Sequence, residues 1–225
     1  MKTFVHLHNH SDYSLLDGAQ TIDGLLNRIS ELNMPAVALT EHGNMFSVVP
    51  FYTAAKKAGI KPIIGCEVYV AEHSRFERKP KSQGGGGYNH LLLLAENNQG
   101  YKNLIKLVSL AYLEGFYYRP RVDRELLVKY NEGLIATSAC IQGKIQRQAL
   151  KGDIDRATET ALDYAGIFKD RFYLEVQNHG LKEEERWYNI AKKMADETGL
   201  PRVATNDTHY SRAEHWEAHL SLIHI

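Results

Sequence analysis

The sequence has little cysteine, no net charge and no long apolar run, and each absence narrows the class of protein. Only two of its 225 residues are cysteines, so a framework of disulfides is excluded. Its 27 Lys and Arg balance 27 Asp and Glu, so any contact with nucleic acid must come from a local basic patch. No apolar run approaches the roughly 20 residues that span a bilayer. Residues 1–14 also carry His and Asp where a signal peptide is apolar, and we therefore expect a cytoplasmic protein without membrane contacts.

Several catalytic motifs are missing as well. The chain has no Gly-x-Ser-x-Gly, no phosphate-binding Gly-Lys-Ser/Thr loop and no Cys-x-x-Cys, which argues against serine hydrolases, P-loop enzymes and zinc ribbons. Hydrophobic residues make up 44% of the chain and charged residues 24%, which is typical of one folded domain with a sizeable core. The unusual residue is histidine, which is present eleven times and is grouped in polar clusters.

Strand-length apolar runs alternate with helix-length periodic segments through most of the chain. Seven runs are predicted to be strands: residues 4–9, 36–40, 61–71, 90–95, 134–137, 171–177 and 202–204. Five segments are predicted to be helices: residues 22–32, 48–58, 98–113, 141–150 and 182–198. This alternation favours an α/β barrel that is closed or nearly closed, with an open doubly wound sheet as the alternative.

One segment, residues 73–87, interrupts this order. It contains Arg75, Arg78, Lys79 and Lys81 and ends in four consecutive glycines. The glycines are not followed by the Lys-Ser/Thr of a phosphate-binding loop, so they do not form one. We expect a flexible surface loop whose positive charge offers a contact to a nucleic-acid backbone.

Side chains that bind metals lie at or near the ends of the predicted strands. In a barrel of parallel strands the carboxyl ends meet at one face, so these side chains are expected to converge. They are His8, His10, His42, Glu67, His90, Cys140, Asp207 and His209. Each is a residue type that binds Zn²⁺, Mn²⁺ or Fe.

The spacing of the first histidines leaves a choice open. His6, His8 and His10 lie two residues apart, so an extended strand puts all three on one face. A lone strand histidine is more often structural than ligating. Here the spaced pair recurs at Asp207 and His209, also after a predicted strand, which favours a site.

The acidic residues differ in what they indicate. Asp17 precedes a glycine in LLDG, which by itself indicates a turn. Glu67 lies inside the apolar run IIGCEVYV, where a buried carboxylate is costly unless it is paired or metal-bound. Glu41 fits a ligand or, preferably, an acceptor that orients the imidazole of the adjacent His42.

The two cysteines, His179 and one aromatic segment complete the candidates. Cys66 points to the opposite face from Glu67 and fits the core, whereas Cys140 follows a strand and fits the core or a ligand equally well. His179 also follows a strand and fits a ligand, a phosphate contact or a turn. Aromatic and basic residues in the segment 116–121 are able to stack on and grip single-stranded DNA, although packing of a helix end is the commoner explanation.

Seven segments, in this order, resemble the polymerase and histidinol phosphatase (PHP) family of metal-dependent phosphoesterases. They are FVHLHNHSDYSLLDGA, ALTEHGN, AAKKAGIKPIIGCEVYVA, GYKNLIKLVSLAYLEGFYYRPRVDRELL, EGLIATSACIQGKI, FKDRFYLEVQNHG and VATNDTHY, and they span nearly the whole chain. Within the family they are most similar to the PHP domains that begin the alpha subunits of bacterial DNA polymerase III. The resemblance implies a distorted (β/α)7-type barrel over residues 1–219, with the metal site at the carboxyl ends of the strands. Residues 220–225 are expected to be a non-native or truncated tail.

The resemblance also implies a ligand set for up to three divalent ions (Zn, Mn or Fe). The nine implied ligands are His8, His10, Asp17, His42, Glu67, His90, Cys140, Asp207 and His209. This set selects His8 and His10 over His6 and changes Asp17 from a turn residue to a ligand. Asp207, His209 and His10 are the implied catalytic residues, with Glu41 and His179 as outer or phosphate-contacting residues. Three divalent ions facing three carboxylates and one thiolate would leave about +2 of charge, which attracts phosphoesters.

The implied activity is metal-dependent phosphoester hydrolysis, which in this family is 3′ to 5′ exonuclease or phosphatase activity. In an alpha subunit, nucleotidyl transfer is carried out by domains that lie beyond residue 225, so this chain alone is not expected to polymerise DNA. The implied partners are DNA, the remaining polymerase domains and other replisome subunits, including a proofreading exonuclease and a sliding clamp. Two interpretations compete with this one: a free-standing enzyme that hydrolyses histidinol phosphate, and a metal-stabilised scaffold for replisome contacts.

Overall fold

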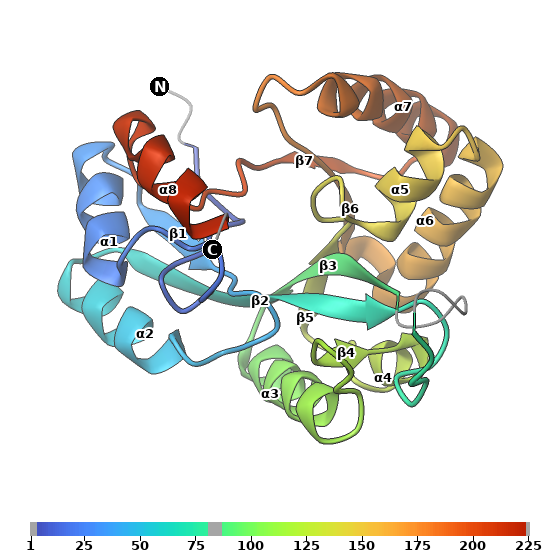
Figure 1. The fold of residues 1–225 in the computed structure, drawn as a ribbon, viewed down its shortest axis with the longest axis horizontal. Coiled ribbons are helices and arrows are strands. Elements are labelled where there is room, and N and C mark those ends of the chain that lie inside the picture. The colour runs from blue at the N-terminus through green and yellow to red at the C-terminus, as the bar shows by residue number, and fades with distance from the viewer. Residues whose placement is uncertain (1–3, 81–86, 224–225) are drawn as a thin grey trace.

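A curled, mixed β-sheet surrounded by helices forms the computed structural model, which describes residues 4–80 and 87–223 (Figure 1). The strands are β1 (Ala36–Leu39), β2 (Lys61–Ala71), β3 (Tyr88–Ala95), β4 (Arg121–Val122), β5 (Leu134–Thr137), β6 (Phe172–Val176) and β7 (Arg202–Ala204). Their order across the sheet is β1-β2-β3-β5-β6-β7, and β4 pairs with β2. The expected α/β fold is confirmed, in the form of a curled half-barrel.

Helices cover the sheet, and short polar side chains begin several of them. The helices are α1 (Ile22–Glu31), α2 (Val48–Lys57), α3 (Asn98–Leu113), α4 (Arg124–Lys129), α5 (Lys144–Leu150), α6 (Ile154–Phe168), α7 (Lys182–Thr198) and α8 (Trp216–Ile223). Thr21, Asn97, Asp123 and Asp153 accept hydrogen bonds from backbone N–H groups in the first turns of α1, α3, α4 and α6. Gly199 ends α7 in the left-handed conformation, with φ of 75°.

The sheet is not the parallel barrel that the alternation of elements suggests. β3 runs antiparallel to both β2 and β5, while β1 with β2, β2 with β4, β5 with β6, and β6 with β7 are parallel. Tyr69, near the end of β2, is therefore paired with His90, near the start of β3. Because the direction of β3 is reversed, the beginning of this strand lies at the same edge as the carboxyl ends of its neighbours.

The predicted strand at residues 4–9 is wrong as regular structure, although the segment lies where a strand would. The N–H groups of Ala38 and Thr40 in and after β1 each donate to its carbonyls at 2.9 Å, and on its other side the N–H of His10 donates to the carbonyl of Thr208 at 2.8 Å. The side chain of Asn9 donates to the carbonyl of Ala38 at 2.9 Å, so a side chain occupies part of the backbone ladder. This segment joins the two ends of the strand order.

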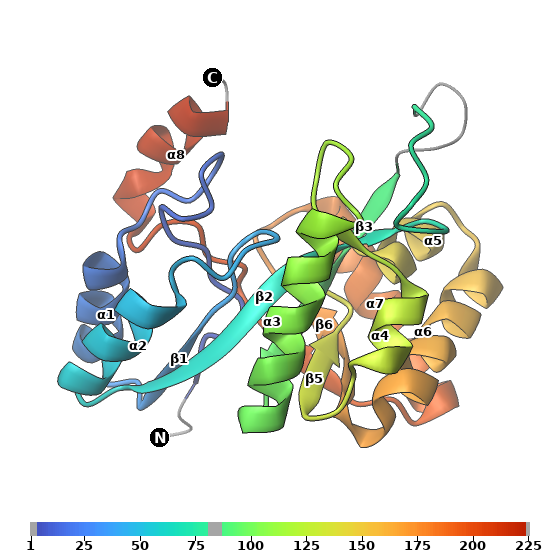
Figure 2. The same ribbon diagram turned by 90° about the horizontal axis from the view of Figure 1, so that it is seen from below.

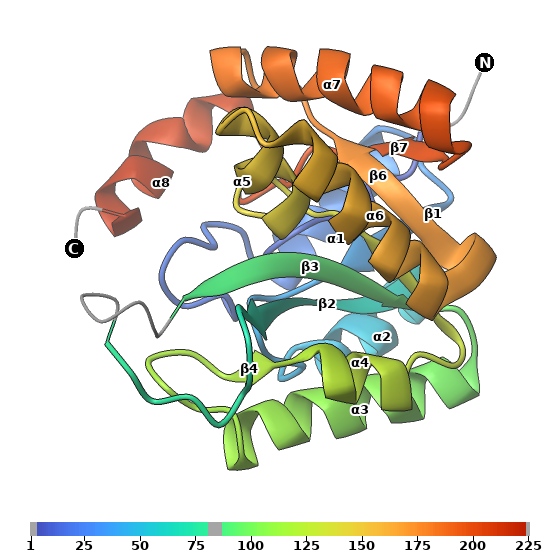
Figure 3. The ribbon, with the colours of Figure 1, turned by 90° about the vertical axis from the view of Figure 1, so that its right-hand side faces the viewer.

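Two hydrophobic cores hold the helices against the sheet. Figure 3 shows α5, α6 and α7 on one side of β2 and β3 and α3 and α4 on the other. The larger core includes Leu93, Leu107, Leu127, Phe168 and Trp187, which are all buried. In Figure 2, α1 and α2 lie together beside β1, where Ile29, Val37 and Phe51 belong to the smaller core. None of the helices in the described ranges has both the length and the apolar character that crossing a bilayer requires.

Several elements differ from the predicted ones. Helix α5 begins at Lys144 rather than at residue 141, and α4, α6 and β4 were not predicted. Strand β4 has two residues and α4 has six, which is too short for a clear period. Helix α6 does carry a signal, since Asp153 caps it and the buried Ala157, Ala161, Tyr164 and Phe168 recur at helical spacing. Helix α8 includes residues 220–223 of the segment expected to be a tail.

The expectation of a flexible basic loop is wrong for Arg75. This side chain is buried, and its guanidinium contacts the carboxylates of Asp123 at 3.0 Å, Glu114 at 2.7 Å and Glu125 at 3.2 Å. Arg78 donates to the carbonyls of Arg75 and Glu114 at 2.6 and 2.5 Å. The charge of Arg75 is therefore neutralised inside the protein. Lys81 and the first three glycines of the run lie outside the described residues.

Candidate metal centre

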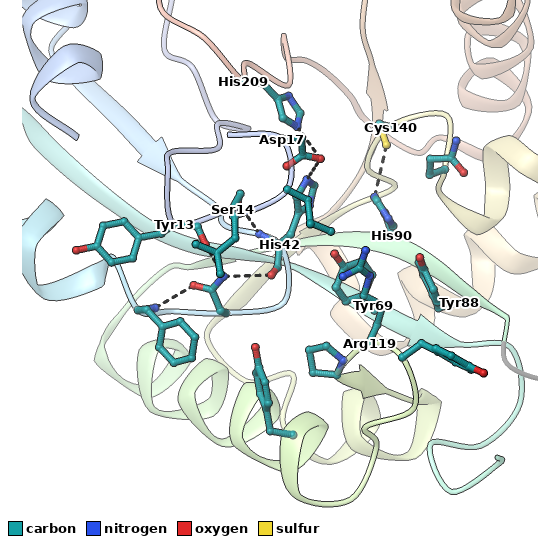
Figure 4. A pocket seen from close by; sticks show the side chains of 18 of the residues that line it. Tyr13, Ser14, Asp17, His42, Tyr69, Tyr88, His90, Arg119, Cys140 and His209 are labelled. Carbon is teal, nitrogen blue, oxygen red and sulfur yellow. Dashed lines mark hydrogen bonds and ion pairs between the residues drawn. The ribbon is translucent and has the colours of Figure 1, made fainter. Parts of the chain in front are cut away.

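The side chains nominated as ligands meet at one edge of the curled sheet, although they come from distant parts of the chain. His8 and His10 lie in the N-terminal segment, Asp17 before α1, His42 after β1, Glu67 in β2, His90 in β3, Cys140 after β5, and Asp207 and His209 after β7. Figure 4 shows five of them, Asp17, His42, His90, Cys140 and His209, gathered at one cavity. Isolated bridges between His42 and Glu67 and between His90 and Gly143 extend the sheet to this point.

Glu67 is the centre of this group. Its carboxylate is completely buried, with Oε1 at 2.9 Å from His90 Nδ1 and 3.4 Å from His8 Nε2. The other oxygen, Oε2, lies 2.6 Å from His42 Nδ1. His10 Nε2 is also 3.9 Å from Oε2, so the partner that a buried carboxylate requires is a set of four imidazoles.

Asp207 and Asp17 hold the other histidines. Asp207 Oδ1 lies 3.3 Å from His8 Nε2 and 3.2 Å from His10 Nε2, and the residue has a left-handed backbone with φ of 45°. Asp and Asn tolerate this conformation better than most residues. Asp17 Oδ2 lies 3.1 Å from His42 Nε2 and 3.8 Å from His209 Nε2, so it faces the cluster and is not only a turn residue.

Buried ligand atoms without hydrogen-bond partners test whether these residues fit a metal. Six such atoms occur here: His8 Nε2, His10 Nε2, Asp17 Oδ1, His42 Nδ1, Glu67 Oε2 and Asp207 Oδ1. His42 Nδ1 and Glu67 Oε2 approach at ion-pair distance, yet the two atoms are not aligned for a hydrogen bond. Buried polar atoms are nearly always satisfied, and imidazole and carboxylate atoms facing one another are satisfied by a shared cation. The donor set therefore fits divalent metal ions.

Three groups of side chains in the cluster bring their ligand atoms within 4.8 Å of one another. They are His10 with His42 and His209, His8 with His10 and Asp207, and His42 with Glu67 and His90. The two groups that contain His10 compete, because its Nδ1 faces Ser14 Oγ at 3.2 Å and a single nitrogen, Nε2, remains. A third ion would need Asp17 or Cys140 as an additional ligand, and both line the same cavity.

Cys140 lies beside the cluster, and the protonation of its thiol depends on the charges around it. Its Sγ is 3.7 Å from His90 Nδ1 and 3.9 Å from Glu67 Oε1. Burial, together with the nearby carboxylates of Glu67 and Asp207, raises the pKa of the thiol well above its usual value. A bound cation opposes this effect, since metals bind the thiolate. Cys66, in contrast, is buried in the core and donates to the carbonyl of Glu41 at 3.3 Å.

Glu175 holds His8 in place and was not among the residues nominated from the sequence. It is fully buried in β6, its Oε1 lies 2.7 Å from His8 Nδ1, and it also accepts hydrogen bonds from Thr137, Thr205 and Gln177. A carboxylate on one imidazole nitrogen fixes the tautomer and directs the other nitrogen to a metal. The sequence offered the same reason to predict Glu175 as to predict Glu67, because Glu175 lies in the apolar run FYLEV just as Glu67 lies in IIGCEVYV.

Glu41 acts on the histidines through serines. Its carboxylate accepts hydrogen bonds from the hydroxyls of Ser11 and Ser14 and from the N–H of Ser11, and its bonds do not go to the ring of His42. Ser14 Oγ lies 3.2 Å from His10 Nδ1 and accepts the backbone N–H of His42 at 3.1 Å. The expected orienting role thus falls on His10, through Ser14.

His179 and His6 are not brought to the cluster. His179 Nδ1 lies 2.5 Å from Glu184 Oε1 and its Nε2 lies 2.5 Å from the carbonyl oxygen of Asn206, so both nitrogens are engaged. His6 packs edge-on against Phe4, with ring centroids 5.0 Å apart. The structure brings His8 and His10 to the cluster and leaves His6 and His179 outside it.

Burial and neighbouring charges shift two imidazole pKa values in opposite directions. Burial by itself lowers the pKa of His42, but the carboxylates of Glu67 and Asp17 outweigh it and raise this pKa to about 10. Burial, with the neighbouring imidazoles of His42 and His209, lowers the pKa of His10 to about 3. In the metal-free chain His42 is therefore a cation near neutral pH and His10 is neutral.

In the presence of a chelator, thermal stability is expected to be greatest near pH 6.5 and to fall on both sides. The raised pKa of His42 contributes stability that is complete below about 6.5 and is lost as the pH rises towards 10. The lowered pKa of His10 acts oppositely, because below about 6.5 the unfolded chain binds the proton first and stability falls towards pH 3. Melting temperatures recorded from pH 4 to 10 by circular dichroism test this, and a steady rise through pH 9 would contradict it.

Comparison with known proteins gives a family and a set of relatives. The PHP domain family matches residues 6–179. The DNA polymerase III subunit alpha of Borreliella burgdorferi is 51% identical over 211 residues, which cover 94% of this chain and 18% of the relative. The same subunit from Thermus aquaticus is 48% identical and covers 99% of this chain and 18% of the relative. The chain spans about a fifth of the length of these relatives.

Solved structures share the fold at low sequence identity. A Chromobacterium violaceum protein described as an amidohydrolase aligns with a TM-score of 0.52 and 15% identity, covering 97% of this chain and 96% of its own. A Bifidobacterium adolescentis protein described as a candidate metal-dependent phosphoesterase aligns with a TM-score of 0.54 and 12% identity, covering 95% and 90%. These identities show a common fold alone.

Proposed function

Because this chain belongs to the PHP domain family, we propose that its histidine and carboxylate cluster binds divalent metal ions and hydrolyses phosphodiesters at a DNA 3′ end. The observation that carries the proposal is the set of buried imidazole and carboxylate atoms that face one another without hydrogen-bond partners. The similarity to DNA polymerase III alpha subunits supports DNA as the substrate and a place in the N-terminal region of such a subunit. Nucleotidyl transfer is then carried out by the remaining domains.

The proposed ligands are the nine residues of the cluster. They are His8, His10, Asp17, His42, Glu67, His90, Cys140, Asp207 and His209, for up to three ions of Zn, Mn or Fe. Divalent ions held in this way lower the pKa of water and neutralise charge on a phosphoryl oxygen. The buried carboxylates keep the imidazoles turned inward, and Glu175 and Ser14 fix the tautomers of His8 and His10.

The proposed catalytic residues lie at different depths. Asp207 and His209 line the cavity and are placed to face a substrate, whereas His10 is buried beneath them and stacks on His209 with centroids 4.5 Å apart. Asp207 and His209 are thus accessible from the cavity and His10 is not, which suits a site that a phosphate enters from the cavity.

The proposed partners follow from the share of the relatives that the chain covers. Since it matches 18% of an alpha subunit, we propose that it is joined to the remaining polymerase domains in the bacterial cytoplasm. Contacts with other replisome subunits, including a proofreading exonuclease and a sliding clamp, belong to the same proposal.

Asp207→Asn is expected to lower both bound metal and DNA hydrolysis by about 100-fold or more, because a neutral amide replaces the charged carboxylate that faces two imidazoles. Asn tolerates the left-handed backbone at this position, so the fold should be retained. Metal content measured by mass spectrometry and release of nucleotides from a labelled single-stranded oligonucleotide are the readouts.

Asp196→Asn is the matched control, since Asp196 is exposed on α7. Full metal content and full activity in Asp207→Asn would overturn the proposal. Wild-type protein that binds metal and melts earlier on chelation, but hydrolyses neither DNA nor histidinol phosphate, would leave only a structural role for the metal.

A further inference from the structure

A cavity of about 590 Å³ opens beside the metal centre, and aromatic rings form its other half. Besides Tyr13, the rings that line the cavity and that the mechanism does not use are Phe46, Tyr69, Tyr88, Tyr112, Phe116 and Tyr118. Arg119 lines the same cavity, near Tyr69 and Tyr88 (Figure 4). We infer that this half is a base-binding wall, on which a nucleobase stacks while Arg119 contacts the adjoining phosphate. The inference rests on the proposed function and names residues that select base-bearing phosphoesters over small ones.

The inner part of the wall touches the metal centre. The ring of Tyr69 lies 5.3 Å from His90 and 6.3 Å from His42, and 4.9 Å from the ring of Tyr88, all measured between centroids. Gly43 permits this position, because it has φ of 61° and a Cβ there would lie 2.8 Å from the Tyr69 ring. A base held at this wall would therefore have its phosphoester next to the metal ligands.

Arg119 supplies a positive charge within the wall. Its guanidinium lies 5.8 Å from the centroid of Tyr69, and its side chain hydrogen-bonds to Tyr88. Arg75 and Arg124, by comparison, contact carboxylates at 3.0 Å or less. The charge of Arg119 thus faces the rings of Tyr69 and Tyr88, with the carboxylate of Asp17 near enough to act on it, and the guanidinium is suited to a phosphate and to cation–π contact with a base.

The outer part of the wall is a row of exposed rings at the mouth of the cavity. Phe46, Tyr112 and Phe116 follow one another with centroids 6.3 and 6.1 Å apart, and they come from the loop after β1 and from the end of α3. Phe46 is 69% and Phe116 51% exposed, so packing of a helix end does not account for them. Rings that are rigid, exposed and close to a charged site form the stacking platforms of single-stranded nucleic acid binding proteins.

Tyr118 adds a strained residue to this surface. It is 75% exposed and has φ of 62°, in the left-handed region that bulky side chains rarely adopt. Such strain persists where the surrounding structure imposes it, and it is concentrated at binding sites. Here the turn that includes the bridge between Tyr117 and Arg119 presents the Tyr118 ring to the cavity.

Binding of labelled single-stranded DNA to the 225-residue chain, measured by fluorescence anisotropy in EDTA, tests the inference. Wild type is expected to bind an oligothymidine about 10-fold more tightly than the same strand with an abasic 3′ residue. Tyr118→Ala should remove most of this preference, and Arg119→Ala should weaken binding of both strands and reduce its salt dependence. Thymidine monophosphate against ribose phosphate, as competitors, separates recognition of a free nucleotide from that of a strand end.

Tyr188→Ala on α7 and Arg156→Ala on α6 are the matched controls, because neither residue lines the cavity. Equal binding of the two strands by wild type, or unchanged preference in both cavity variants, would overturn the inference. The assay needs neither metal nor turnover. A protein that binds both strands alike in EDTA, yet hydrolyses DNA when metal is supplied, would lose the inference and keep the proposed function. Base-dependent binding in EDTA without hydrolysis in metal would keep the inference and overturn the proposed function.

Discussion

Glu67→Gln is expected to abolish metal binding at the centre, with a loss of affinity greater than about 100-fold. The completely buried carboxylate lies within 3.9 Å of four imidazoles, and changing even an outer partner of a ligand costs about 10- to 100-fold. The amide keeps the size of the side chain but removes its charge. The increase in melting temperature on adding Zn²⁺ or Mn²⁺, and the bound metal after dialysis, are the measurements.

In the presence of a chelator, the same substitution should also reduce the fall in melting temperature between pH 6.5 and 10. The carboxylate of Glu67 is the foremost group that raises the pKa of His42, so this pKa should fall towards its ordinary value in the variant. Glu72→Gln is the matched control, since Glu72 follows the same strand and pairs with Lys144 at 3.1 Å at a partly exposed position. If Glu67→Gln retained wild-type metal content, Glu67 would not be a ligand.

Arg75→Met is expected to destabilise the chain by about 3 kcal/mol, because it leaves the buried carboxylate of Asp123 without its cation. Met retains much of the side-chain volume, so the loss is that of the charge and its hydrogen bonds. Asp123 also caps α4 and accepts a hydrogen bond from the backbone N–H of Arg75, so the substitution should destabilise both the start of α4 and the segment around residue 75. Chemical denaturation at pH 7 gives the free energy of unfolding.

Arg124→Met is the control for this experiment. Arg124 pairs with Asp163, but the two side chains are 63% and 40% exposed, and exposed pairs contribute less than about 1 kcal/mol. Similar losses in the two variants would show that the burial of Arg75 has no energetic consequence.

The cluster could be anticipated because its residues stand out locally. A carboxylate inside an apolar strand needs a partner wherever the strand is placed, and this reasoning alone required neighbours for Glu67. Convergence was expected from parallel strands, yet His90 lies near the beginning of β3 and reaches the cluster because β3 runs antiparallel. The direction of a strand depends on how the connections fold, which hydrophobic spacing does not encode.

Other features depended on contacts between distant residues. Arg75 belongs to a stretch whose composition indicates a loop, but its three carboxylate partners are 39 to 50 residues away in the sequence. Residues 4–9 have the apolar alternation of a strand, whereas the side chain of Asn9 takes a place in the backbone ladder. Neither a long-range salt bridge nor a side-chain amide that replaces a backbone hydrogen bond changes the spacing of hydrophobic residues in the sequence.

The bridge between Asn9 and Thr208 has a consequence for synthesis of the protein on the ribosome. The hydroxyl of Thr208 donates to the side chain of Asn9 across 199 positions of the sequence. A nascent chain that has emerged as far as residue 200 possesses most of the cluster but lacks Asp207 and His209. If the cluster binds metal as proposed, tight binding has to await synthesis of the segment after β7, and a chain that terminates before this segment would not be stabilised by zinc or manganese.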